Sequence, residues 1–206
     1  MKTLLTRSIS GLIFVAVIIG SILWNEKSVL IIFAVISGIG VYEFHRLFQS
    51  KKTFNLSSLV TAIAGITCFI SFIYPIYFLQ KSVQQGLIDS SVFILVLFVL
   101  YVLYQLWMNR PSVIVNLWLF LFGICYVVVP LYIGVLIHLP DENAFPALLG
   151  IFILVWTNDT FAYLSGNLFG KNKLIERISP NKTWEGFIGG FIFTIIIGFL
   201  VDVQFF

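Results

Sequence analysis

Residues 156–190 read WTNDTFAYLSGNLFGKNKLIERISPNKTWEGFIGG, a polar, glycine-rich stretch in a chain otherwise made of apolar runs. It has one acid, Asp159, inside an apolar segment, and four cations follow it, namely Lys171, Lys173, Arg177 and Lys182. Glycines let backbone approach a ligand closely, and clustered cations suit phosphate oxygens. The stretch therefore predicts a phosphate-binding segment between two apolar helices.

The composition of the 206 residues places the chain in a membrane. Hydrophobic residues make up 60% and charged residues 10%, whereas a soluble domain carries roughly 25% charged residues. The mean hydropathy is +1.05. The net charge of +3 is small, and we expect no nucleic-acid partner. Cys68 and Cys125 lie in apolar segments, where we expect single small side chains rather than a disulfide.

The apolar runs predict a polytopic, all-α integral membrane bundle of about seven transmembrane helices. We expect spans near residues 9–23, 28–43, 56–79, 88–107, 112–139, 144–165 and 183–201. Several approach the ~20 residues that cross a bilayer, and Pro130 predicts a kink in the fifth. The first run could be a signal peptide, but Trp24-Asn25-Glu26-Lys27 offers no small-residue cleavage site, which favours a retained span.

Positive charges are distributed unevenly between the alternating loops of this arrangement. Ten of the twelve Lys and Arg residues fall on one side: Lys2, Arg7, Arg46, Lys51, Lys52, Arg110, Lys171, Lys173, Arg177 and Lys182. Lys27 and Lys81 fall on the other side. Cytoplasmic loops carry the excess of cations. We therefore expect a cytoplasmic N-terminus in a bacterial-type inner (plasma) membrane, and one domain over residues 1–206 with a cytoplasmic substrate loop at about 166–186.

The same stretch resembles a known family. The matching residues are Asp159-Thr160, Ala162-Tyr163, Gly166, Phe169-Gly170-Lys171, Leu174, Ile178-Ser179-Pro180, Lys182-Thr183-Trp184-Glu185-Gly186 and Gly189-Gly190, with Arg7, Ser8 and Glu43 earlier in the chain. Together they resemble the phosphatidate cytidylyltransferases (CDP-diacylglycerol synthases). The family also has an acidic block after the position of Gly190, which these residues do not contain. The chain therefore resembles a shortened member of the family.

The resemblance implies a function. It predicts a membrane nucleotidyltransferase of phospholipid biosynthesis that joins CTP to phosphatidate, with Mg²⁺ as cofactor, giving CDP-diacylglycerol and pyrophosphate. Three alternatives remain: a related CTP-dependent polyprenol or lipid kinase, a transporter built around Asp159 and the broken fifth helix, and an inactive membrane fragment. A homodimer is an open possibility for its assembly.

The candidate site residues follow from both arguments. Asp159 and Lys182 are the candidate catalytic residues, and Asp159 is the candidate metal ligand. The candidate substrate-binding residues are Lys171, Lys173, Arg177, Ser179, Thr183 and Gly170. A carboxylate within a span costs roughly 2.5–3.5 kcal/mol, so we expect Asp159 to face a polar cavity or a partner.

Each of these assignments has a structural alternative. The cations could serve membrane topology alone, and Asp159 could pair with Lys182. In favour of phosphate binding, Ser179 could cap a helix that begins at Pro180, and the N-terminus of that helix would favour an anion. Glu176 and Glu185 lie among cations and are expected to pair with them, while Glu43, His45 and Arg46 could form an interfacial salt bridge or a wall of the site.

Small residues carry a further alternative. The spacing Gly186-x-x-x-Gly190 predicts close helix packing, whereas Gly166-x-x-x-Gly170 fits packing or a close backbone approach to a ligand.

Overall fold

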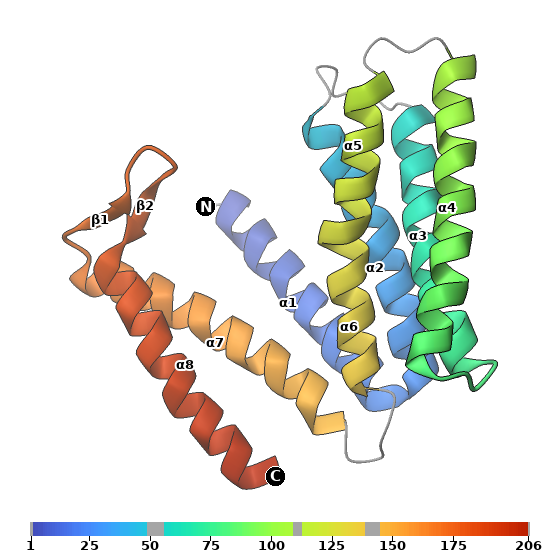
Figure 1. The fold of residues 1–206 in the computed structure, drawn as a ribbon. Coiled ribbons are helices and arrows are strands. Elements are labelled where there is room, and N and C mark those ends of the chain that lie inside the picture. Colours follow the sequence, from blue (N-terminus) through green and yellow to red (C-terminus); the bar gives the residue numbers. More distant parts are fainter. Residues whose placement is uncertain (1, 49–55, 109–112, 139–144, 206) are drawn as a thin grey trace. The chain divides into compact units, whose positions relative to one another are not determined.

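The computed structural model describes residues 2–48, 56–108, 113–138 and 145–205, and nearly all of them are helical (Figure 1). They form two compact units, Met1–Pro140 and Asp141–Phe206. Six helices are long and apolar enough to cross a membrane, and residues 9–24 form a shorter apolar helix. The chain is therefore an all-α, polytopic integral membrane protein, as the apolar runs predict.

The first unit contains the first five helical segments of the chain. They are α1 (Lys2–Trp24), α2 (Glu26–Leu47), α3 (Leu56–Tyr77), α4 (Val83–Trp107) and a longer helix made of α5 (Val113–Gly123), a π-helical turn (Ile124–Val128) and α6 (Val129–His138). Asn25 caps α2, since its side-chain oxygen accepts a hydrogen bond from the backbone N–H of Ser28 at 2.9 Å.

The irregularity predicted at Pro130 takes the form of the π-helical turn immediately before it. Proline has no N–H to donate to the carbonyl four residues earlier, and its ring crowds that carbonyl. Tyr126, the residue at that position, lies within the π-helical turn. Such turns are a recognised way to accommodate a break in the hydrogen-bond ladder.

Helices of the first unit pack through small residues and buried hydroxyls. A Cβ placed on Gly65 of α3 would lie 3.0 Å from the carbonyl oxygen of Ser37 on α2. The Ser90 hydroxyl of α4 donates to the carbonyl of Ser71 on α3 at 2.8 Å. Interfaces of this kind are typical of membrane helices. In lipid the hydrophobic effect does not drive helices together, so they associate through close packing and hydrogen bonds.

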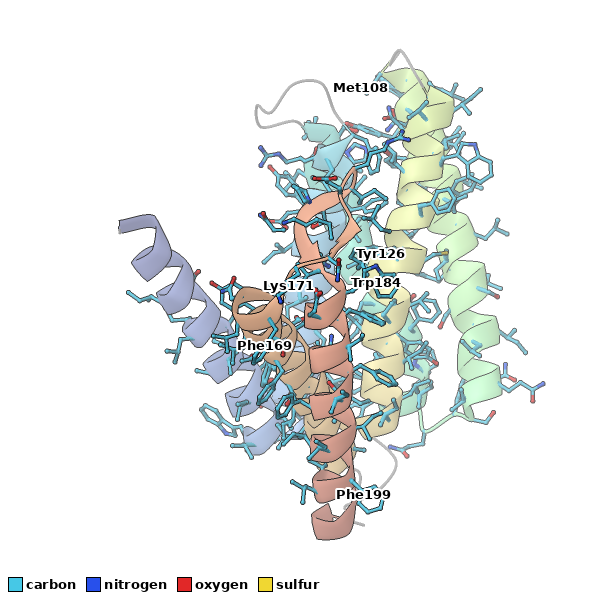
Figure 2. All side chains as sticks on the ribbon, turned by 90° about the vertical axis from the view of Figure 1, so that its left-hand side faces the viewer. Met108, Tyr126, Phe169, Lys171, Trp184 and Phe199 are labelled. Carbon is cyan, nitrogen blue, oxygen red and sulfur yellow. The ribbon has the colours of Figure 1, made fainter. Side chains whose placement is uncertain are left out.

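The second unit is a pair of antiparallel helices joined by a β-hairpin (Figure 1). It comprises α7 (Phe145–Phe169), β1 (Lys173–Ile175), β2 (Ser179–Thr183) and α8 (Trp184–Phe205). The connection predicted as a loop is thus partly strand, and α7 continues beyond the predicted end near residue 165. Figure 2 shows Phe169 at the end of α7, Trp184 at the start of α8 and Phe199 toward the far end of α8.

Close packing between α7 and α8 depends on glycine, as the Gly186-x-x-x-Gly190 spacing predicts. A Cβ on Gly186 would lie 2.7 Å from the carbonyl oxygen of Ala162, and one on Gly190 would lie 2.9 Å from that of Asn158. The rings of Phe161 and Phe193 stack with centroids 3.9 Å apart. The two helices therefore form one interface that leads directly into the hairpin.

Candidate functional site

The hairpin brings the two halves of the cationic segment together. Strands β1 and β2 pair antiparallel, with Lys173 opposite Thr183 and Ile175 opposite Ser179, and residues 176–178 form the turn. Lys182 therefore lies next in sequence to the residue that pairs with Lys173. Two cations separated along the chain become neighbours at the base of the hairpin.

The start of α8 is set by Thr183 and not by Ser179. The predicted cap at Ser179-Pro180 is wrong, because both residues belong to β2. Helix α8 begins at Trp184, and the Thr183 hydroxyl oxygen accepts a hydrogen bond from the backbone N–H of Gly186 at 3.2 Å. Thr183 is thus the last strand residue and the helix cap at once.

A cavity of about 750 Å³ lies between the hairpin and the adjoining ends of the two helices. Helix α7 contributes residues at helical spacing, and so one stripe of α7 faces the cavity. The lining residues are Asn158, Asp159, Ala162, Tyr163, Gly166 and Asn167 from α7; Gly170, Lys173, Leu174, Ser179, Asn181, Lys182 and Thr183 from the hairpin region; and Gly186 and Phe187 from α8.

Six of the eight predicted site residues line this cavity: Asp159, Gly170, Lys173, Ser179, Lys182 and Thr183. Lys171 and Arg177 are not among the lining residues. Lys171 lies between α7 and β1, where Figure 2 labels it, and Arg177 lies in the hairpin turn. Both are exposed. The structure thus groups the predicted cations into two that line the cavity and two that do not.

Asp159 faces this polar cavity, as the cost of a carboxylate within a span predicts. No ion pair joins it to Lys182 among the described residues. The alternative in which this acid serves only to pair with that lysine is not what the structure shows. The carboxylate and the ammonium group instead contribute separately to the wall of one cavity.

Three amide side chains in the wall were not predicted as site residues. Asn158, Asn167 and Asn181 each line the cavity and can both donate and accept hydrogen bonds. The helical spacing of Asn158, Ala162 and Gly166 could have indicated this stripe of α7, with Asn167 beside it. Asn181 had no such signal, because the strand that presents it was not predicted.

Glu185 does not pair with a cation, contrary to the sequence-based expectation, in the part of the chain that the structure describes. Its carboxylate accepts hydrogen bonds from Asn172: from the backbone N–H at 3.1 and 3.2 Å, and from the side-chain amide at 2.9 Å. Glu176 is exposed in the hairpin turn. Neither acid lines the cavity, and Asp159 is the carboxylate that does.

The oxygens of the cavity determine which metal it could hold. The described residues contain no group of three or more His, Cys, Asp or Glu side chains placed to bind an ion. Mg²⁺ is usually held by one or two carboxylates together with substrate phosphates and water. Asp159, with phosphates beside Lys173 and Lys182, fits that donor set, whereas a site made entirely of protein ligands does not fit.

Glu43, His45 and Arg46, near the end of α2, belong to the first unit. His45 is buried there, with its Nδ1 3.4 Å from the Ser58 hydroxyl and its Nε2 3.5 Å from the Tyr101 hydroxyl. The Arg46 guanidinium lies over the Tyr42 ring, 5.5 Å from its centroid. These contacts place His45 in a polar network between helices α2, α3 and α4.

Comparison with known proteins relates nearly the whole chain to one family. The model of the cytidylyltransferase family matches residues 5–205. Over 63 residues the chain is 49% identical to a phosphatidate cytidylyltransferase of Haemophilus influenzae, a stretch that covers 31% of this chain and 22% of the relative.

Two further relatives give the same result. A phosphatidate cytidylyltransferase of Staphylococcus haemolyticus is 59% identical over 46 residues, covering 22% of this chain and 18% of the relative. Phosphatidate cytidylyltransferase 1 of Rattus norvegicus is 46% identical over 66 residues, covering 31% and 14%. The matched stretches thus span less than a quarter of each of these relatives.

Proposed function

Because the chain belongs to the cytidylyltransferase family, we propose that it acts as a membrane nucleotidyltransferase. It would join CTP to phosphatidate, producing CDP-diacylglycerol and pyrophosphate. The observation that carries this proposal is the cavity that Asp159, Lys173 and Lys182 line together. The phosphatidate cytidylyltransferases similar to this chain in part of their length support the choice of substrates.

The cavity suits a polyphosphate because of the groups that it gathers. Lys173 and Lys182 supply two ammonium groups, and Ser179 and Thr183 supply hydroxyls from the same hairpin. Charge-assisted hydrogen bonds to phosphate are shorter and stronger than neutral ones. The start of α8 lies in the same wall, and a helix N-terminus also favours an anion.

The reaction that we propose is a displacement at phosphorus. A phosphate oxygen of phosphatidate attacks the α-phosphorus of CTP, a new P–O bond forms, and the bond to the bridging oxygen of the β-phosphate breaks so that pyrophosphate leaves. Lys173 and Lys182 hold the triphosphate and stabilise the negative charge that develops on the leaving oxygens. The protein positions groups and performs no covalent step itself.

Mg²⁺ is the cofactor that we propose for this site. Asp159 would hold the ion together with the phosphate oxygens of the nucleotide. When bound, a divalent ion polarises phosphoryl oxygens and neutralises charge on them. The remaining residues of the wall orient the nucleotide, with Asn158, Asn167 and Asn181 available to donate to its oxygens or base.

We propose that the hairpin faces the cytoplasm, with the N-terminus on the same side of the inner membrane. The charge distribution supports this orientation, because ten of the twelve Lys and Arg residues then lie on the cytoplasmic side. CTP would reach the cavity from the cytoplasm, and phosphatidate would reach it from the adjoining leaflet.

Labelled CTP tests the proposal and separates it from the kinase alternative. The purified protein in lipid nanodiscs that contain phosphatidate and a polyprenol is given Mg²⁺ and CTP labelled at the α- or the γ-phosphate. Transfer of the α-label to lipid, with the γ-label released in pyrophosphate, supports the cytidylyltransferase. Transfer of the γ-label to a polyprenol or another lipid alcohol, with release of CDP, would establish the kinase instead.

A further inference from the structure

Glu185 occupies an unexpected position for an acid beside a phosphate-binding cavity. It lies in the first turn of α8, next in sequence to Gly186 of the cavity wall, but it does not line the cavity itself. Its carboxylate binds Asn172, which precedes β1 on the other side of the hairpin. One oxygen accepts from both the side-chain amide and the backbone N–H of Asn172, at 2.9 and 3.1 Å, and the other oxygen accepts from the same N–H at 3.2 Å.

Asn172 also accepts a hydrogen bond from the start of α8. The backbone N–H of Trp184 donates to the carbonyl oxygen of Asn172 at 3.0 Å. Lys171 and Trp184, which flank the two ends of the hairpin, are both labelled at its base in Figure 2. Asn172 is therefore held through its N–H, its carbonyl and its side chain. The contacts continue the pairing of Lys173 with Thr183 one step beyond the strands.

The contacts between Glu185 and Asn172, called the clamp below, stabilise a hairpin that is short. Its strands have only three and five residues, and an isolated two-stranded hairpin is marginally stable in water. A carboxylate in the first turn of a helix is also favoured by the unpaired N–H groups there. The clamp fixes the base of the hairpin, where Lys173 and Lys182 enter the cavity wall.

We infer that Glu185 is a positioning residue: by binding Asn172, it holds the base of the hairpin so that Lys173 and Lys182 are presented to the cavity. The inference rests on the proposed function for the identity of the substrate, but the clamp and the anion site can be measured without turnover. In this role Glu185 touches neither nucleotide nor metal.

Hydrogen exchange tests the clamp directly. In the purified protein in nanodiscs, peptides covering residues 170–185 are followed by mass spectrometry. Glu185→Ala should speed exchange there about tenfold or more, since local opening loses charge-assisted hydrogen bonds. Glu185→Gln keeps one acceptor oxygen and should stay close to the parent protein. Glu176→Ala, at the exposed turn, is the matched control. Unchanged exchange in Glu185→Ala would overturn the inference.

Binding of inorganic pyrophosphate, measured by calorimetry, tests the presentation of the lysines. Glu185→Ala should weaken binding about tenfold, while Glu185→Gln retains most of the affinity. Asn172→Ala should weaken binding less, because its backbone N–H remains, and should add little to Glu185→Ala. A Glu185→Gln defect as large as that of Glu185→Ala would overturn positioning through these hydrogen bonds, because the glutamine keeps an acceptor oxygen for the amide groups of Asn172. Affinity unchanged in Glu185→Ala would also overturn it.

The two proposals fail in different ways. If the parent protein forms no CDP-lipid from CTP, the proposed function fails, while exchange and pyrophosphate binding still decide the role of Glu185. If the parent protein is active and Glu185→Ala matches it in exchange and binding, the positioning role fails alone.

Discussion

The hydroxyl oxygen of Thr183 accepts a hydrogen bond from the backbone N–H of Gly186 at 3.2 Å. The last residue of the hairpin is therefore also the N-cap of α8. Thr183 is buried and lines the cavity. One residue therefore joins the strand that carries Lys182 to the helix that packs on α7. The geometry of the site and the stability of the helix are linked at this position.

Replacing Thr183 tests that link. Thr183→Val removes the cap and should lower the free energy of unfolding by about 1 kcal/mol. Thr183→Ser keeps a hydroxyl and should recover most of the loss. Thermal unfolding in detergent, followed by circular dichroism, provides the comparison. A Thr183→Val variant as stable as the parent protein would show that the cap contributes nothing.

The lysines of the cavity and the lysine outside it should behave differently. Lys182→Met should reduce kcat/KM for CTP roughly 10- to 100-fold, the range expected when a charged group loses its hydrogen-bonding partner. Lys171→Met, which removes the same charge from a residue that does not line the cavity, serves as the control and should change it little. Equal defects would indicate that the net charge of the segment acts and not the position of each cation.

Packing of α7 on α8 should be disrupted by an added methyl group at Gly186 but not by one at Gly198. A Cβ on Gly186 would meet the backbone of Ala162 at 2.7 Å, whereas one on Gly198 would meet Leu154 Cδ2 at an ordinary 3.5 Å. Gly186→Ala should therefore lower the yield of folded, monodisperse protein on size-exclusion chromatography, and Gly198→Ala should not. A Gly186→Ala variant as well behaved as the parent protein would contradict the close backbone approach.

Membrane orientation can be measured by cysteine labelling in a background without Cys68 and Cys125. A cysteine at Asn172 should react with an impermeant maleimide from the cytoplasmic side of sealed vesicles, and one at Gln84 from the opposite side, because the excess of cations is cytoplasmic. Reaction of both cysteines from the same side would refute the proposed topology.

The helices could be predicted from the sequence because long apolar runs show directly in composition, and the family resemblance pointed to the residues of the cavity. The hairpin could not be predicted, since residues 176–178 read Glu-Arg-Ile and lack the Asn-Gly or Asp-Gly pair that marks tight turns. Ser179-Pro180 was misread for the same reason. A serine before a proline has the local character of a helix start, and only the pairing of Ser179 with Ile175 shows that it is strand.

The partners of the two acids also depended on that unpredicted pairing. Glu185 lies among cations in sequence, but the closed base of the hairpin brings the amide groups of Asn172 to it. Asp159 lies inside an apolar run, and the hairpin adds Lys173, Ser179, Asn181, Lys182 and Thr183 to its polar surroundings. The spacing of charges along the sequence cannot reveal contacts that form only when two strands pair.

The role of Asp159 in the reaction is tested most directly by the yield of CDP-diacylglycerol from α-labelled CTP and phosphatidate, measured for the protein carrying Asp159→Asn. This substitution keeps the size of the side chain and removes the carboxylate that lines the cavity. Asp89→Asn, at the half-buried ion pair with Lys81 in the first unit, is its control. We predict CTP-dependent product from the parent protein and from Asp89→Asn, and a loss of at least about 100-fold in Asp159→Asn, the order found when a group that stabilises transition-state charge is removed. Product formation by Asp159→Asn at the parent rate would contradict the account.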